Sequence, residues 1–570
     1  MSATSRLALA SLGTALVIGI LGDQLILHAN GFGLGAFLWV AALAAATVIL
    51  ARWFLQKDQA GAPHSEMPQD GPLQDHLPQE GPPQDGTAQR QLAQDDTLQG
   101  LMSQDDTPQS QSTEGGTPHG WLPEGHTPRA PLSEGGALQG EGRWLLAGAV
   151  VFAACLVWRA SEFLQALNIL AIGLCLGLAA LTVRAGRISR AGVLTYPLGL
   201  VASGLYHLIG PFLLLFSDVE WKALSRDRSS RYAVAAVRGI VIAIPLLLVF
   251  GSLLAAADAV FAELLDRAFA WDAREWIIHM VGTLFFGFLA AGFLRTGLIR
   301  EPDGLPRLGA QQETRSFGLG AIETGVVLGL LNLLFLAFVL VQVRYFFGGA
   351  DLVMATADLT YAEYARSGFF ELLQVTALVL PVMLALHWAL PEADRTAHRL
   401  FRLLGIPLVG LLFIVMASAL QRMWLYVLEY GLTELRLYST AFMLWMAFLF
   451  IWFLATVMRG VRDRFAVGAL AGGLAVLLIL HAVNPDALIV RTNIARAQAT
   501  GRFDVEYAAS LGHDAVPTLA ANLDRLPATE QDRLVRRLRQ RFNRAPLADW
   551  RSWNLGRARA AQVLSSLGSE

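Results

Sequence analysis

Residues 402–422 read RLLGIPLVGLLFIVMASALQR, and no charged side chain occurs between the two flanking arginines. A run of this length can cross the hydrocarbon core of a bilayer as one helix. Similar runs recur along the chain, which has 570 residues, 54% of them hydrophobic and only 16% charged. Soluble globular chains have about 25% charged residues. The sequence therefore predicts an all-α, polytopic bundle of transmembrane helices.

Twelve segments are long and apolar enough to be candidate spans, and we expect about 11–12 of them to cross the membrane. They are residues 7–27, 33–54, 144–159, 163–183, 191–216, 234–255, 276–298, 319–343, 369–390, 402–422, 438–458 and 464–483. The predicted domains are an N-terminal transmembrane hairpin, a linker, the main transmembrane bundle and a small soluble tail that is mostly helical. Their boundaries are 1–56, 57–142, 143–483 and 484–570.

The linker carries a five-residue repeat, as in PQDGPLQDHLPQEGPPQDG at 68–86, and fifteen copies fill residues 67–141. A period of five matches neither the 3.6 residues of a helical turn nor the two-residue repeat of a strand. No apolar position recurs that could build a core. We therefore predict a disordered, solvated linker. It is either a neutral expansion in a tolerant loop or a tether for partners.

Arginines in short loops indicate which ends of the spans face the cytoplasm. Loops 300–316, 391–402 and 459–464 each carry three arginines, which places the tail outside, in the periplasm of a cell with two membranes. The early chain conflicts with this pattern, because basic clusters at 184–190 and 222–231 are separated by one candidate span. Residues 191–216 are therefore either a re-entrant pair of half-helices or a kinked span with one basic loop outside. In the re-entrant case the N-terminus and the array are cytoplasmic.

Charged residues inside spans are candidate functional residues, because a charge at the bilayer centre costs at least about 2.5–3.5 kcal/mol. Asp23 lies near the outer end of the first span, where a capping or interfacial role is the simpler interpretation. Glu323 opens the span at 319–343, where it would interact favourably with a helix N-terminus. His207 and His279 are interpreted as satisfied core or interface residues.

A denser polar group is predicted at the outer face, around QVRY at 342–345, TYAEYARSGFFELLQV at 360–375 and WLYVLEY at 424–430. By helical periodicity, several of its members share one face of a helix. The group forms either an outward-open polar pocket or an aromatic belt with snorkelling arginines. Its members are Arg344, Tyr345, Tyr361, Tyr364, Arg366, Glu371, Arg422, Tyr426 and Glu429.

Motifs of soluble enzymes are missing from the sequence. The patterns GxxxxGK[ST], HExxH and GxSxG do not occur, so no catalytic residue, cofactor or metal site is predicted. The two cysteines, Cys155 and Cys175, lie in apolar runs and are expected to be small buried hydrophobes. A net charge of −2 implies no nucleic-acid partner, and the lipid bilayer is the one partner that the sequence predicts.

Several stretches resemble a bacterial family of multi-pass membrane proteins, catalogued as domain of unknown function 4173 and close to its sibling 4153. They include LTYAEYARSGFFELLQV at 359–375, FVLVQVRYFFGG at 338–349 and ADAVFAELLDRAF at 257–269. The resemblance covers nearly the whole chain except the array. It implies an integral protein of the inner membrane and supplies no catalytic residue, substrate or cofactor.

Three functions follow as hypotheses. The first is transport of a small solute or ion through the outer polar pocket. The second is a non-enzymatic sensor or scaffold that uses the tail and the linker to bind partners. The third is an enzyme acting on a lipid-linked substrate, with Glu371, Glu429 and the arginines around an anionic head group. The sequence favours a non-enzymatic protein, with transport slightly ahead.

Overall fold

The computed structural model describes residues 2–60, 141–183, 192–221, 273–299, 318–357, 368–391, 393–542 and 549–567, with scattered residues between 232 and 264. All regular elements in this part of the chain are helices, which confirms the all-α fold. Residues 61–135 form a unit of their own, separate from 1–60 and 136–570. That unit holds most of the repeat array and lies outside the described residues, so the predicted disorder stays a prediction.

Ten helices of the described chain are long and apolar enough to cross a membrane, and each corresponds to one predicted span. A further apolar helix of 17 residues matches the prediction at 144–159. The predicted span at 234–255 lies where only scattered residues are described. In order, the helices are α1 (Ala3–Gly22), α2 (Leu34–Ala60), α3 (Gly142–Trp158), α4 (Glu162–Thr182), α5 (Thr195–Leu213), α9 (Ala273–Leu294), α10 (Ala321–Ala357), α12 (Phe369–Ala389), α13 (Arg395–Tyr430), α14 (Glu434–Thr456) and α15 (Phe465–Val483).

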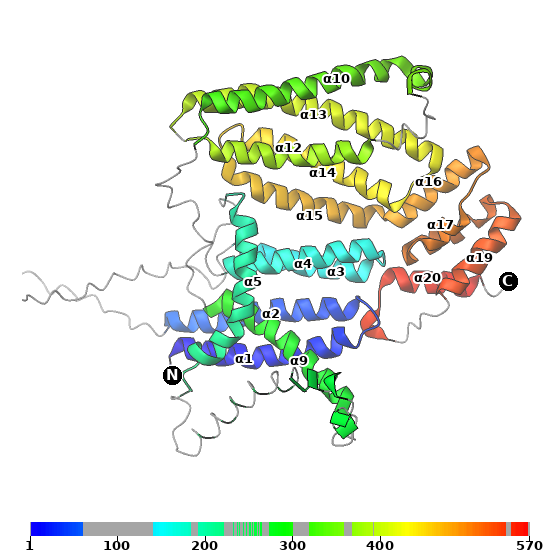
Figure 1. Ribbon diagram of the computed structural model, residues 1–570. Coiled ribbons are helices and arrows are strands. Elements are labelled where there is room, and N and C mark those ends of the chain that lie inside the picture. The colour runs from blue at the N-terminus through cyan, green and yellow to red at the C-terminus, as the bar shows by residue number, and fades with distance from the viewer. Residues whose placement is uncertain are drawn as a thin grey trace, which may run out of the picture. The chain divides into compact units, whose positions relative to one another are not determined.

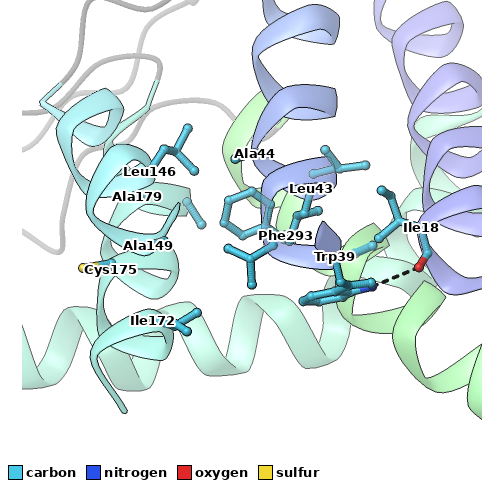
Figure 2. Packing of buried hydrophobic residues seen from close by; sticks show 14 of the residues in the cluster. Ile18, Trp39, Leu43, Ala44, Leu146, Ala149, Ile172, Cys175, Ala179 and Phe293 are labelled. Atoms are coloured by element: carbon cyan, nitrogen blue, oxygen red, sulfur yellow. Dashed lines mark hydrogen bonds between the residues drawn. The ribbon is translucent and has the colours of Figure 1, made fainter. Parts of the chain in front are cut away.

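Helices α1 to α4 and α9 share one buried core. Figure 2 shows the ring of Phe293, from α9, between Ala44 of α2 and the aliphatic side chains of α3 and α4. The indole N–H of Trp39 donates to the carbonyl of Ile18 over 3.0 Å. This bond matters because an unpaired donor in hydrocarbon costs several kcal/mol.

Helices α1 and α9 pack closely through small residues. Gly19 of α1 lies so near the carbonyl of Thr283 and the backbone of Gly287 that a Cβ there would clash with both. Small residues at such crossings let the backbones of transmembrane helices approach each other. Ala15 meets Gly287, whereas Asp23 meets His279, so the two helices run antiparallel.

The second half of the bundle has its own core, formed by α10, α12, α13, α14 and the first turn of α15. Helix α13 contacts α10, α12 and α14. Large side chains such as Phe401, Phe450 and Phe453 are fully buried in this core. Each half of the bundle therefore has an apolar interior of its own.

A compact helical domain, hereafter the tail domain, follows α15. Its helices are α16 (Pro485–Thr500), α17 (Val505–Ser510), α18 (Val516–Ala520), α19 (Ala528–Phe542) and α20 (Leu555–Ser566). They enclose a small core that includes Val490, Leu519 and Leu534. Helix α19, which contains TEQDRLVRRLRQRF, packs an apolar stripe against this core. Its arginines lie on the exposed side. Figure 1 shows these orange and red helices together at one end of the bundle helices.

The tail domain is fixed by hydrogen bonds to three loops of the bundle. Arg557 donates to the carbonyl of Phe32 between α1 and α2 over 2.6 Å. Asn554 donates to the carbonyls of Leu156 and Arg159 at the end of α3. The amide of Asn493 exchanges hydrogen bonds with the backbone of Leu432, between α13 and α14. We call the side of the bundle that carries these loops the tail face. The side at the other ends of the same helices is the opposite face.

Helix α5 crosses the bundle close to the opposite face. Ser203 in its middle donates to the carbonyl of Gly177, near the end of α4. Further along, Gly210 packs against Gly292, near the end of α9. Figure 1 shows α5 running across the direction of α3 and α4.

The chain after α5 stays at this face. A five-residue π-helix, Leu214–Asp218, continues α5, and Asp218 pairs with Arg295 over 2.6 Å. The next contact joins the amide of Glu220 to the hydroxyl of Ser5, at the start of α1. Residues 195–218 thus form one continuous helix and not a pair of half-helices, with Pro211 tolerated at the step into the π-helix. This helix is long and apolar enough to remain a candidate span.

Candidate functional site

Asp23 is a carboxylate buried inside a candidate membrane span, with 1% of its surface exposed. It stands where α1 widens into a π-helix, Asp23–Leu27, near the tail face. Single π-helical turns inside helices occur frequently at functional sites. An ionisable group at such a depth is by default a functional candidate.

The two carboxylate oxygens of Asp23 have different surroundings. Oδ2 lies 2.6 Å from Nδ1 of His279 on α9 and accepts a hydrogen bond from Gln24 over 3.0 Å. Oδ1 is buried and accepts no hydrogen bond from the described residues, and Nδ1 of His28 is 3.7 Å from it. One oxygen is therefore held in place while the other is left as a buried acceptor.

The two histidines lie side by side above this carboxylate. Their rings stack with centroids 4.1 Å apart and planes 17° from parallel. Nδ1 of His28 is 2.9 Å from the backbone carbonyl of Asp23, which orients the ring. The side chains of His28 and His279 remain 26% and 31% exposed. The histidines thus connect the buried carboxylate with the exterior.

The site depends on a glycine and is closed on one side. A Cβ at Gly282 of α9 would lie 2.5 Å from Oδ1 of Asp23, so this position leaves the room that the carboxylate occupies. Toward the opposite face, the crossing of Gly19 with Thr283 and Gly287 brings α1 and α9 into backbone contact. Asp23, His28 and His279 thus form a cluster at the tail-face end of two packed helices, and we call it the Asp–His cluster.

Comparison with known proteins places the chain in a family. Residues 146–522 match the family described as Domain of unknown function (DUF4153), which is more than half of the chain. The chain belongs to the DUF4153 family. No curated protein and no solved structure matches it. The predicted resemblance to a family of unknown function is thereby confirmed for the sibling 4153, while membership of 4173 itself stays a prediction. The DUF4153 match includes His279 but neither Asp23 nor His28.

Of the predicted outer group, the DUF4153 structure brings Arg422 into a buried network between α10 and α13. Arg422 donates to Oε1 of Gln342 over 2.8 Å, and Ser418 donates to the same oxygen over 3.1 Å. A Cβ built on Gly368, just before α12, would lie 3.0 Å from the guanidinium. Glu371 follows in the first turn of α12 and is exposed.

The remaining members of that group do not join this network or lie outside the described residues. Tyr426 stacks with Arg436, whose guanidinium lies 3.8 Å from the ring centroid. Glu429 is exposed, and its carbonyl accepts a hydrogen bond from Arg496 of the tail domain. The side chains of Arg344 and Tyr345, and all of Tyr361, Tyr364 and Arg366, are not described. A common outer pocket stays a prediction.

The other residues that the sequence singled out lie at separate places. Glu323 is in the first turn of α10. His207 is hydrogen-bonded within α5, with Nδ1 near the Ser203 carbonyl. Cys155 and Cys175 are buried free thiols, and Cys175 belongs to the first core. His28 is the site residue that the sequence did not reveal. Its only signal is the five-residue spacing from Asp23, which fits a π-helix but not an α-helix.

A second polar cluster lies where the DUF4153 bundle meets the tail domain. Oδ2 of Asp514 accepts hydrogen bonds from the amides of Ala160 and Ser161, over 2.6 and 3.2 Å, at the start of α4. Asp486 at the start of α16 is fully buried beside it. Burial, and then the charges of Asp514 and Glu434, raise the pKa of the Asp486 carboxyl to about 7. Burial also raises the pKa of Asp514.

Proposed function

We propose that this DUF4153 protein is a membrane sensor, in which a small cation binds at the Asp–His cluster and the tail domain responds. One observation carries the proposal. Five residues after His28, Gly33 lies against the backbone of Trp553, and the amide of Leu34 donates to the carbonyl of Trp553 over 3.0 Å. A shift of His28 on binding would therefore reach the tail domain through one short loop.

The tight crossing of α1 and α9 favours sensing over passage between these helices. A cation entering from the tail face meets backbone contact at Gly19 and Gly287 before it reaches the opposite face. Transport is the second candidate, supported by the cost of keeping the carboxylate of Asp23 inside a span. It would need these two helices to separate. A reaction on lipid-linked substrates has the least support, since Glu371 and Glu429 are exposed and the arginine between them in sequence, Arg422, is bound by Gln342.

We further propose that the tail face is periplasmic in a bacterial inner membrane. The arginine-bearing loops at 300–316, 391–402 and 459–464 adjoin helix ends of the opposite face, which would be cytoplasmic. A transverse position of α5 along the opposite face would remove the conflict in the early chain. The basic clusters at 184–190 and 222–231 flank a helix that need not cross, so both can be cytoplasmic.

Hydrogen exchange of the full chain in lipid nanodiscs tests the sensor. Adding a cation that binds the Asp–His cluster is expected to change amide exchange in residues 549–567, which include Trp553, and to leave residues 528–542 unchanged. The response should be absent in Asp23→Asn and in the milder His28→Gln. Identical exchange with and without bound cation would overturn the proposal. Cation flux into proteoliposomes, lost in the same variants, would favour transport instead.

A further inference from the structure

We propose that the Asp–His cluster binds a divalent transition metal ion, with Zn²⁺ the favoured occupant. The cluster joins Asp23 and His28 of the first hairpin to His279 of α9, more than two hundred residues later in the chain. The inference deepens the proposed sensor and rests on it for its biological role, because it names the cation that the tail domain would report.

The donor set selects the class of metal. One carboxylate and two imidazoles match the nitrogen and oxygen ligands of Zn²⁺ and its first-row neighbours. Ca²⁺ and Mg²⁺ prefer oxygen ligands and high coordination numbers, which two imidazoles do not supply. Three protein ligands also leave a fourth position open to water, as in many accessible zinc sites.

The spacing fits a common centre. One ligand atom from each of Asp23, His28 and His279 lies within 4.8 Å of the other two. Tetrahedral zinc with bonds of about 2.0–2.2 Å places its ligand atoms about 3.3–3.6 Å apart. The 2.6 Å contact between Oδ2 of Asp23 and Nδ1 of His279 would have to widen. Nδ1 of His28, 3.7 Å from Oδ1 of Asp23, would have to give up its hydrogen bond with the Asp23 carbonyl before it could bind the metal.

Two further observations point to a ligand in this place. Within the part of the chain that the structure describes, Oδ1 of Asp23 is buried without a hydrogen bond, which is costly unless another group satisfies it. Gly282 leaves free the volume in which that oxygen lies. Meanwhile Gln24 holds Oδ2, as neighbours of metal-binding carboxylates commonly do. A simple hydrogen-bonded pair of Asp23 with His279 would explain neither Oδ1 nor the second histidine.

Titration of the purified full-length chain with Co²⁺ tests the site. The protein is purified without a histidine tag, stripped with a chelator and placed in nanodiscs, and the visible absorption of bound Co²⁺ is recorded. We expect saturation at one equivalent, with displacement by Zn²⁺ but not by Ca²⁺ or Mg²⁺. Affinity should fall at least tenfold in Asp23→Asn and His28→Gln. His398→Gln is the matched control, because Nδ1 of His398 also contacts a backbone carbonyl, that of Asp394.

The outcomes separate the two proposals. Lack of saturable binding in the wild type, or equal affinity in the cluster variants and the control, overturns the metal site. If Asp23→Asn does not fold, His28→Gln decides alone, since its side chain is partly exposed. Metal binding without any change in tail exchange supports the metal site and contradicts the sensor. A tail response to protons alone, without metal binding, supports the sensor and overturns the metal.

Discussion

Gly282 supplies no ligand atom to the proposed metal site, yet its missing side chain leaves room for the carboxylate of Asp23. Replacing Gly282 by alanine puts a Cβ 2.5 Å from Oδ1 of Asp23, so the carboxylate must turn away. We expect Gly282→Ala to weaken Co²⁺ binding at least tenfold, measured by the same titration. Gly329→Ala is the control, because nothing lies within 4 Å of its Cβ. Unchanged affinity in Gly282→Ala would mean that Oδ1 is not a ligand.

The sequence showed that Asp23 is a charged residue in an apolar run, but it did not show which residues contact it. Asp23 stood out because a carboxylate in an apolar run is costly. His28 fell in a short loop, and His279 was one histidine among apolar neighbours. Their meeting depends on the antiparallel packing of α1 and α9, which one sequence does not contain. The same holds for Asp486 and Asp514. Asp514 binds the backbone of Ala160 and Ser161, far away in the chain, and no motif in the sequence predicts that contact.

At the scale of single elements, α5 gives the clearest contrast between sequence and structure. Its length and apolarity predicted a span or a re-entrant pair, and its helical nature was correct. Its direction was not predictable, because hydropathy reports how apolar a segment is and not which neighbours it crosses. The contacts of Ser203 with Gly177 and of Asp218 with Arg295 set that direction. Small residues at Gly210 and Gly292 allow it.

Cysteine labelling tests the transverse position of α5. Gly192→Cys and Glu220→Cys, introduced singly on either side of α5, should react with a membrane-impermeant maleimide from the same side of the membrane. Asp532→Cys in the tail domain should react from the other side. Native Cys155 and Cys175 are buried and should give little background. Labelling of positions 192 and 220 from different sides would show that α5 spans the membrane.

At the scale of the whole molecule, the tail domain should lose stability as pH rises. The pKa of Asp486 is raised from 3.8 to about 7 in the folded chain, so the folded state binds the proton more tightly than the unfolded state. Its contribution is therefore complete below pH 4 and is lost as pH rises through 7, by about 1.4 kcal/mol per pKa unit. Asp514 has the same sign.

We therefore expect the tail domain to unfold at lower temperature at pH 8 than at pH 5. Asp486→Asn removes the buried charge and should reduce this difference by raising the unfolding temperature at pH 8. Asp532→Asn, an exposed aspartate on α19, is the control and should leave the difference unchanged. Thermal unfolding followed by tail-domain fluorescence at the two pH values gives the measurement. An equal difference in Asp486→Asn and the wild type would contradict the assignment.

The bundle itself was largely predictable, because long apolar runs leave a chain few alternatives to helices in lipid. The docking of the tail domain onto three loops was not, since it rests on single pairs such as Asn493 with Leu432 and Arg557 with Phe32. Those pairs connect segments far apart in the chain. They also give the molecule a route by which an event at His28 reaches the tail domain.

Thermodynamic reciprocity tests whether the Asp–His cluster and the tail domain are coupled. If metal binding alters the tail contact, weakening that contact must alter metal affinity by the same factor, typically about 5- to 150-fold. Arg557 holds the loop that follows His28. The measurement is the ratio of Co²⁺ dissociation constants in Arg557→Ala and the wild type, with the exposed Arg537→Ala as the matched control. We predict that Arg557→Ala binds Co²⁺ at least fivefold more weakly than the wild type and that Arg537→Ala binds it with unchanged affinity. Equal affinity in all three proteins would contradict the coupling.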